Sequence, residues 1–357
     1  MDLIELLRNL VFINSVYPNE NEICEFVSSH LISLGFNVER VYIPNTNRFS
    51  IVANRGDNPR LAFFGHLDTV EVSRGWDTNP FELTENNGRL YGLGTYDMKG
   101  GVACILHAAS QTTEPLRIII SVDEENISEG AHVLSSTSCF EGLDGVISAE
   151  AGNSHDFTGG LSRITVSRRG RIVLSGNVYG SSAHGASGLG VNAIGNALRV
   201  YEQLEIINNE LTGYVKPSLF IRKFNAEARS LSVPDVASLE IDRHYIVGES
   251  IENIIEDLSS LVSDVQIVPR RTPYMSPYNF SSSSFSNRIS DLIESYNGVR
   301  PLENHALSVG DENVIALHCP VVIIGCGGAN EHSANEYVLK KSLIDVCNAY
   351  VHIIRNF

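Results

Sequence analysis

The chain has 357 residues, of which 43% are hydrophobic, and a formal net charge of −16. This length allows two compact domains. An acidic chain without a basic cluster binds nucleic acid poorly, because phosphate contacts need Lys and Arg. No apolar run approaches the roughly 20 residues that span a bilayer. We therefore expect neither nucleic acid nor a membrane as a partner.

Two further features favour a cytoplasmic protein. Residues 1–8 contain acids where a signal peptide would be basic, and no small-residue cleavage site follows, so an amphipathic helix is predicted there. The six cysteines stand singly, mostly in apolar stretches, without a CxxC motif. Such cysteines are typical of reduced, buried residues in a cytosolic protein.

The first part of the chain alternates between helical and strand-like segments. Apolar residues have helical spacing over 3–12 and 21–34, and 100–110 is predicted to be a helix rich in small residues. Short β-branched or aromatic runs lie between and after these helices, at 37–43, 49–53, 61–64, 116–122 and 145–148. This alternation predicts an α/β fold with a doubly wound, mostly parallel sheet.

The pattern changes near residue 162. Strands and helices are then predicted in the order β-α-β-β-α-β, at 172–178, 191–204, 219–224, 237–245, 251–262 and 265–269. This is the order of a ferredoxin-like α+β domain. A strand at 321–325 and a closing helix at 343–354 follow. We therefore predict a catalytic domain of residues 1–161 and 272–357, interrupted by an inserted domain of residues 162–271.

Apolar runs of the predicted catalytic domain end in acids and a histidine. One run leads into His66 and Asp68, another into Glu124 and Glu125, and a third into Glu150. The carboxyl ends of parallel strands share one edge of a sheet, so these side chains should lie close together. Buried carboxylates without a counter-ion are unfavourable. A divalent-metal site explains them jointly, although each motif alone is commonplace.

The spacing within two of these motifs suggests a division of roles. His66 and Asp68 lie at i and i+2, so in an extended backbone both point to the same side. One of them can bind metal while the other orients it. Glu124 and Glu125 are adjacent, so their side chains diverge. One could bind metal while the other faces the substrate as a general base.

Two more residues, Asp97 and His332, join Glu150 to complete the candidate ligand set. Asp97 ends a glycine-flanked turn, whose glycines permit backbone conformations that side chains forbid. Glu150 ends a strand-like run, and His332 lies in the late segment 331–334. Two histidines and several carboxylates form a mixed nitrogen and oxygen donor set. Such a set suits zinc, with cobalt or manganese as substitutes.

Other catalytic schemes find less support in the sequence. No GxSxG nucleophile motif occurs, and the serines preceding His184 lack a strand-turn-helix setting. The glycine-rich segments 188–190 and 325–328 are not followed by the Lys-Ser/Thr of a phosphate-binding loop. Segment 91–94 lacks the full dinucleotide-binding pattern.

Taken together, the motifs carry a family resemblance. They are GHLDTV at 65–70, YGLGTYDMKGG at 91–101, SVDEE at 121–125, the strand end at Glu150, and Glu331-His332. This set is similar to that of the co-catalytic zinc aminoacylase and carboxypeptidase-like metallohydrolases. That family includes acetylornithine deacetylase, succinyl-diaminopimelate desuccinylase and dipeptidases. Segment 75–84 looks most like the corresponding part of acetylornithine deacetylase.

The resemblance implies two divalent metal ions per subunit, most often zinc, with cobalt or manganese as substitutes. Asp97 would bridge the two ions. His66 and Glu150 would complete one site, and Glu125 and His332 the other.

The same resemblance implies catalytic and substrate-binding residues. Asp68 would hold His66, and Glu124 would be the general base that passes a proton to the leaving amine. His184, on the inserted domain, would reach the other subunit's active site and stabilise the oxyanion, which implies a homodimer. Arg243 would grip a substrate carboxylate with both arms of its guanidinium. An exposed strand arginine without such a role is the alternative.

Three departures from the family's pattern concern the substrate more than the reaction. Leu231 stands where relatives usually have Asn, and Ala151 follows Glu150 where relatives often have Pro. Residues 325–328 are Gly-Cys-Gly-Gly instead of a Gly-Pro-Gly turn. None of these positions is a predicted metal ligand or the predicted base.

The expected function is zinc-dependent hydrolysis of the amide bond in a small N-acyl amino acid, as in acetylornithine deacetylase. A dipeptidase or carboxypeptidase of the same family, acting on a short peptide, is the alternative. A metal-retaining binding protein without turnover is a more distant one. Loss of Glu124 or His184 would have favoured it, and both are present. A homodimer formed through the inserted domain is expected.

Overall fold

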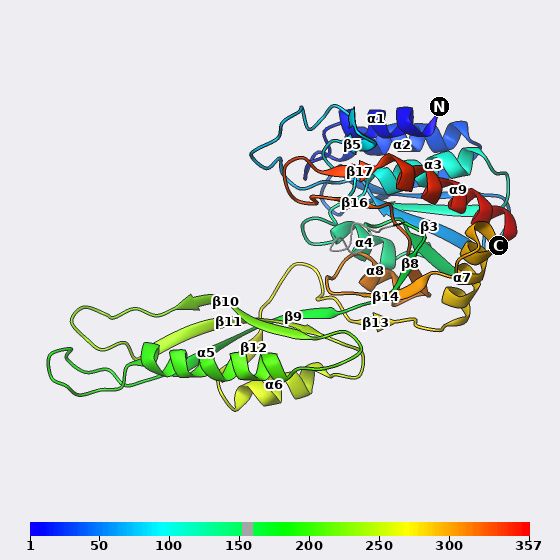
Figure 1. Ribbon diagram of the computed structural model, residues 1–357. Helices are drawn as coiled ribbons and strands as arrows, with labels where there is room; N and C mark the ends of the chain where they lie inside the picture. Colours follow the sequence, from blue (N-terminus) through cyan, green and yellow to red (C-terminus); the bar gives the residue numbers. More distant parts are fainter. Residues whose placement is uncertain (152–159) are drawn as a thin grey trace. The chain divides into compact units, whose positions relative to one another are not determined.

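The computed structural model describes residues 1–151 and 160–357, which divide into two compact units (Figure 1). Unit 1 contains Met1–Ser167, Asn279–Ala306 and Gly310–Phe357. Unit 2 contains Arg168–Tyr278 and Leu307–Val309. Each unit has its own cluster of buried apolar side chains.

The limits of unit 2 differ from the predicted inserted domain, residues 162–271, at both ends. Strand β8 (Arg163–Arg168) pairs with β15 (Val321–Ile323) in the large sheet, so the chain stays in unit 1 until Ser167. At the other end, the backbone N–H of Arg171 donates to the carbonyl of Met275 at 2.9 Å. This hydrogen bond ties the residues after 271 to unit 2.

The helices of unit 1 bury the faces on which their apolar residues recur. Helix α1 (Leu3–Phe12) begins at Asp2, whose side chain accepts a hydrogen bond from the Glu5 N–H at 2.8 Å. Its buried residues, Leu3, Leu6, Leu7, Leu10 and Val11, follow helical spacing. The other helices in the described part of the unit are α2 (Asn21–Ser33), α3 (Lys99–Ser110), α4 (Glu129–Ser135), α7 (Ser284–Asn297), α8 (Glu312–Ile315) and α9 (Lys340–Asn356).

The large sheet of unit 1 is mixed. Its strand order is β1-β2-β6-β3-β7-β15-β8-β13, with β14 beside β8. The central strands β6, β3, β7 and β15 are parallel neighbours, whereas β1, β2 and β8 pair antiparallel. The expectation of a mostly parallel sheet is therefore wrong for its flanks. The bounds not yet given are β1 (Asn37–Tyr42), β2 (Phe49–Arg55), β3 (Leu61–His66), β6 (Leu116–Ser121), β7 (Gly145–Ser148), β13 (Tyr278–Asn279) and β14 (Leu302–Ala306).

Helices cover both faces of this sheet, as a doubly wound fold requires. On one face, the Phe63 ring lies 4.6 Å from the Tyr350 ring of α9. On that same face, a Cβ at Gly65 would lie 2.9 Å from Val102 of α3. On the other face α4 packs against β1, β2 and β6, where a Cβ at Gly130 would lie 2.9 Å from the Ser50 hydroxyl. The central strand β3 is consequently buried along its whole length.

A small antiparallel sheet in unit 1 joins two distant segments of the chain. Its order is β16 (Gly328–Ala329), β17 (Tyr337–Leu339), β5 (Arg89–Tyr91) and β4 (Thr84–Asn86). Strands β5 and β17 lie side by side in Figure 1. This pairing brings the loop that follows β5 close to the loop that precedes β17. The Gly92 N–H donates to the Glu336 carbonyl at 3.2 Å.

Unit 2 contains the predicted β-α-β-β-α-β order of elements. They are β9 (Gly170–Tyr179), α5 (Ala193–Glu210), β10 (Ser218–Asn225), β11 (Val236–Tyr245), α6 (Ile251–Ser259) and β12 (Ser263–Ile267). The strands pair antiparallel in the order β10-β11-β9-β12, as in a ferredoxin-like sheet. Asn192 and Ser250 cap the two helices through their side-chain oxygens.

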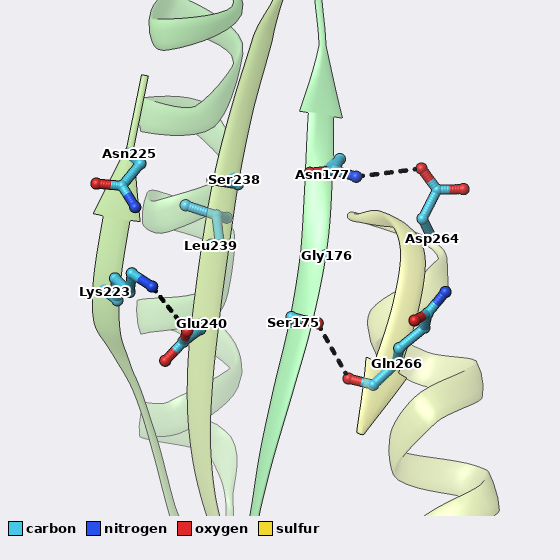
Figure 2. Close-up of a pocket in the computed structure, with 10 residues that line it drawn as sticks. All are labelled: Ser175, Gly176, Asn177, Lys223, Asn225, Ser238, Leu239, Glu240, Asp264 and Gln266. Atoms are coloured by element: carbon cyan, nitrogen blue, oxygen red, sulfur yellow. Dashed lines mark hydrogen bonds and ion pairs between the residues drawn. The ribbon is translucent and has the colours of Figure 1, made fainter. Parts of the chain in front are cut away.

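One face of the unit 2 sheet is polar. Figure 2 shows hydrogen bonds that link neighbouring strands on this face. Lys223 donates to Glu240 at 3.1 Å, and Asn177 donates to Asp264 at 3.3 Å. Alternate residues of the same strands face the helices and form the apolar cluster, for example Leu239 and Ile241.

The cysteines follow the sequence-based expectation. All six lie within the described residues, where they are buried and form no disulfide. Among the helices of the described chain, none has the length and apolar character needed to cross a membrane.

Candidate metal centre

The carboxyl end of β3 places His66 among carboxylates. The side chain is fully buried, and its Nδ1 lies 3.1 Å from the Asp68 carbonyl oxygen and 3.7 Å from Asp68 Oδ1. Its Nε2 lies 3.2 Å from Asp97 Oδ1 and 3.3 Å from Glu150 Oε2. One ring nitrogen thus faces the residue predicted to orient it, and the other faces two predicted ligands.

A second group forms around His332, which lies in the loop before β17. Its Nε2 lies 2.9 Å from Glu125 Oε2 and 3.3 Å from Asp97 Oδ2. His332 is half-exposed and has a positive φ of 56°. Glu125, from the turn after β6, is therefore the member of the adjacent glutamate pair that contacts a histidine.

Asp97 connects the two groups. Its Oδ1 faces His66 and its Oδ2 faces His332, so each carboxylate oxygen serves a different histidine. One potential ligand atom from each of His66, Asp97 and Glu125 lies within 4.8 Å of the others. The described residues therefore contain a candidate metal site that includes three of the five predicted ligands. Glu150 and His332 adjoin it through the contacts given above.

The charges of this cluster fit bound cations. Hydrogen bonds with Asp97 and Glu125 raise the pKa of His332 to about 11. Burial, followed by repulsion from Asp97, raises the pKa of Glu150 to about 8. The pKa values of both a carboxyl group and an imidazole are raised here, as expected where several carboxylates lie close together. Carboxylate oxygens and imidazole nitrogens at these positions fit divalent ions of the zinc type.

Comparisons with known proteins agree with this geometry. The sequence profile described as peptidase family M20/M25/M40 matches residues 62–356. The chain belongs to this family. It is accordingly a hydrolase of amide bonds, as its motifs predicted.

Curated relatives of this M20 enzyme include desuccinylases. A probable succinyl-diaminopimelate desuccinylase from Staphylococcus aureus (strain Mu50) is 28% identical over 339 residues, which cover 82% of each chain. A succinyl-diaminopimelate desuccinylase from Orientia tsutsugamushi (strain Ikeda) is 25% identical and covers 99% of this chain and 95% of its own.

Solved structures show the same fold at lower identity. A tripeptidase from Staphylococcus aureus aligns with a TM-score of 0.79 at 21% identity, covering 99% of this chain and 97% of its own. The aminopeptidase PepT from Bacillus cereus aligns with a TM-score of 0.81 at 19% identity and the same coverage. A Bacillus subtilis protein described as a dinuclear metal binding peptidase of the M20 family has a TM-score of 0.75 at 15% identity, covering 99% of this chain and 96% of its own.

The turn that carries Glu124 and Glu125 is attached to Asp68. The Glu125 N–H donates to Asp68 Oδ2 at 2.9 Å, which joins the residue beside His66 to the acidic pair. Burial raises the pKa of Glu124 well above its usual range, although the neighbouring His66 lowers it. Glu124 is partly buried beside the ligand cluster, and its role as the general base stays a prediction.

A buried ion network in this M20 enzyme fixes the start of that turn. Asp123 has a positive φ of 74°, a conformation that is uncommon outside glycine. Its Oδ1 accepts a hydrogen bond from Arg48 at 3.0 Å, and Arg48 also pairs with Glu20. All three side chains are almost completely buried. No local sequence pattern predicts this network, because its members are far apart in the chain.

Two other buried acids near the centre, Asp311 and Glu312, were not predicted from the sequence. Asp311 Oδ2 accepts a hydrogen bond from the Ser121 hydroxyl at 2.5 Å, and burial raises the pKa of Asp311 to about 7. Glu312 Oε1 accepts one from the Ser148 hydroxyl, also at 2.5 Å. Ser121 and Ser148 end β6 and β7, the two strands beside β3. An acidic pair after a glycine, Gly310-Asp311-Glu312, was the only available sequence signal.

The two predicted residues of unit 2 have different surroundings. His184 lies in an exposed loop, where its Nδ1 accepts a hydrogen bond from the Ala186 N–H at 3.2 Å. Arg243 is buried and ion-paired with Glu249, and it also donates to the carbonyl of His244. A substrate carboxylate would have to replace Glu249 at this guanidinium. The catalytic role of His184 and the substrate-binding role of Arg243 stay predictions.

Replacement of Arg48 tests the ion network. Arg48→Met should lower the free energy of unfolding by about 3–5 kcal/mol, because Glu20 and Asp123 would remain buried without their counter-ion. The measurement is chemical denaturation. The control is Arg40→Met, which removes an exposed pair with Glu25 and should cost at most about 1 kcal/mol. Equal effects of the two substitutions would contradict the importance of the network.

Proposed function

We propose that this M20 enzyme is a two-zinc deacylase that hydrolyses the amide bond of a small N-acyl amino acid. The observation that carries the proposal is the position of Asp97, with one carboxylate oxygen toward His66 and the other toward His332. The desuccinylase relatives, at 25–28% identity, support an acylated amino acid as the substrate.

The ligand assignment follows the two contact groups. His66 and Glu150 would hold one ion, His332 and Glu125 the other, and Asp97 would serve both. A pair of divalent ions held by these residues would lower the pKa of bound water and polarise the scissile carbonyl. Zinc suits the donor set, and cobalt or manganese can substitute.

The remaining residues have roles in proton transfer and orientation. Asp68 lies on the Nδ1 side of His66 and would keep Nε2 directed toward Asp97 and Glu150. Glu124 would accept the proton of the attacking water and deliver it to the leaving amine. Glu124 directly precedes Glu125, which contacts His332, so Glu124 can lie beside the metal ligands without being one of them.

A substrate panel separates the candidate functions. The zinc-loaded protein should hydrolyse N-succinyl or N-acetyl amino acids with a kcat/KM well above that for dipeptides. Release of free amine measures turnover on all substrates equally. The opposite order of substrates would favour a dipeptidase or carboxypeptidase. No turnover of any substrate by protein with a full zinc content would favour a binding protein.

Paired substitutions distinguish the base from the ligand. Glu124→Gln should retain two zinc ions by elemental analysis and lose kcat by about 10²-fold or more, because a positioned proton acceptor is removed. Glu125→Gln should lose zinc as well as activity, since Glu125 contacts His332. Normal turnover by Glu124→Gln, or its loss of zinc, would show that the assignment is wrong.

Exposed apolar side chains of unit 2 support a homodimer. Strand β10 lies at the edge of its sheet, where unpaired backbone groups can join a second copy. Phe220 and Phe224 of β10 are exposed, as are Leu198, Tyr201 and Ile206 on α5, which packs against β10. We infer that this surface meets its equivalent in a two-fold dimer.

A mixture of two inactive variants tests the dimer and His184 together. His184→Ala removes the proposed oxyanion donor and should reduce kcat by about 10²–10³-fold. Glu124→Gln removes the proposed base. After subunit exchange each mixed dimer would contain one site with both residues intact, so activity should return. Labelled subunits verify the exchange by mass. Proven exchange without recovered activity would exclude action of His184 across the dimer.

A further inference from the structure

Glu336 is a buried glutamate that contacts the backbone on the N-terminal side of Asp97. It is 2% exposed and lies in the loop between β16 and β17. Its Oε2 accepts a hydrogen bond from the Gly94 N–H at 2.7 Å. Its Oε1 accepts two more, from the Tyr96 N–H at 2.8 Å and the Asp97 N–H at 3.0 Å. Both oxygens of one side chain thus hold the segment that ends in Asp97.

These contacts make Glu336 suited to fixing Asp97. A carboxyl group that accepts backbone N–H groups on both of its oxygens cannot rotate without breaking these hydrogen bonds. Asp97 has to present its two oxygens in different directions, toward His66 and His332. A small rotation of its backbone would move both oxygens at once.

The residues around Gly94 restrict the backbone conformation of segment 94–97. Gly94 has a φ of 75°, and a Cβ there would lie 2.7 Å from Thr69 and 3.2 Å from the side chain of Lys99. Lys99 is fully buried and donates to the Ile13 carbonyl at 3.1 Å. The segment is therefore packed against Lys99 and Thr69 at Gly94, and held by Glu336.

Glu336 also belongs to the loop that carries His332. The two residues lie four positions apart, and β17 follows immediately, paired with β5. One loop therefore supplies a candidate ligand directly and orients Asp97 through its backbone. Any shift of this loop would move His332 and Asp97, two of the proposed ligands of one metal ion, at the same time.

We propose that Glu336 is a positioning residue that sets the orientation of Asp97 and thereby the affinity of the enzyme for its metal pair. This inference rests on the proposed two-metal function. In the metal-free protein Glu336 holds Asp97 in the orientation that the ions require, so binding need not order this segment. Removal of such a supporting contact typically weakens metal binding by about 10- to 100-fold.

The decisive variant is Glu336→Gln. Its amide oxygen can still accept hydrogen bonds, but its NH2 group would face at least one backbone N–H. Zinc titration against a competing chelator should show weaker binding of both ions, by about 10- to 100-fold, because Asp97 serves both. The matched control is Glu85→Gln, which removes the charge of an exposed glutamate on β4 of the same small sheet. That variant should retain wild-type zinc affinity.

The zinc titrations distinguish failure of the positioning role from failure of the proposed function. Folded Glu336→Gln with wild-type affinity for both ions would overturn the positioning role and leave the proposed function intact. Wild-type protein that takes up no zinc would refute the proposed function itself.

Hydrogen exchange of the wild-type protein provides a test that needs no folded variant. The amides of Gly94, Tyr96 and Asp97 should be protected both with zinc and after chelation, because Glu336 and not the metal holds them. Rapid exchange of this segment in the chelated, folded protein would overturn the proposal even if Glu336→Gln does not fold. Slow exchange there would support it.

Discussion

The structure of unit 1 depends on the concentration of carboxylates around Asp97. Glu125 and Glu150 converge with Asp97 on two imidazoles, and Glu124 is partly buried beside them. Buried carboxylates repel one another and lose hydration, so they persist only where cations or hydrogen-bond donors offset the cost. Two divalent ions would neutralise the inner ligands. The protein itself supplies donors for the acids behind them, such as the serine hydroxyls that hold Asp311 and Glu312.

This constraint explains why the centre draws on two different sheets. The parallel strands β3, β6 and β7 end at one edge, where His66 is the last residue of β3 and Glu125 and Glu150 follow β6 and β7. Residues at a sheet edge can approach a pair of metal ions from one side only. Asp97 and His332 come from loops joined by the small antiparallel sheet, far from one another in the chain. Unit 1 therefore combines the carboxyl edge of its large sheet with two loops, carrying Asp97 and His332, that the small sheet holds together.

The sequence predicted the helices and strands well because their signals are local, and the structure brings the predicted ligands His66, Asp97 and Glu125 together. The apolar run that ends at His66 is buried along its whole length, and its change from apolar to polar residues indicates that the histidine lies at a strand end. The mixed sheet and the Asp311 contact depend on pairings between distant segments, which no local pattern encodes. Arg243 shows a different limit. Its neighbours Ile241 and Tyr245 face the apolar cluster of unit 2, so strand alternation buries the arginine with them, where Glu249 is its partner.

The departures from the family's pattern divide between the two units. In unit 1, the Ala151 N–H donates to Glu150 Oε1 at 3.1 Å, a bond that the usual proline cannot make because it lacks an N–H. The change therefore adds a contact to a candidate ligand. In unit 2, the Leu231 carbonyl accepts a hydrogen bond from Gly185, and its side chain is 74% exposed beside the His184 loop. A leucine in place of an amide removes polar groups from that surface. The first departure thus adds a hydrogen bond in unit 1, and the second makes the exposed surface of unit 2 less polar.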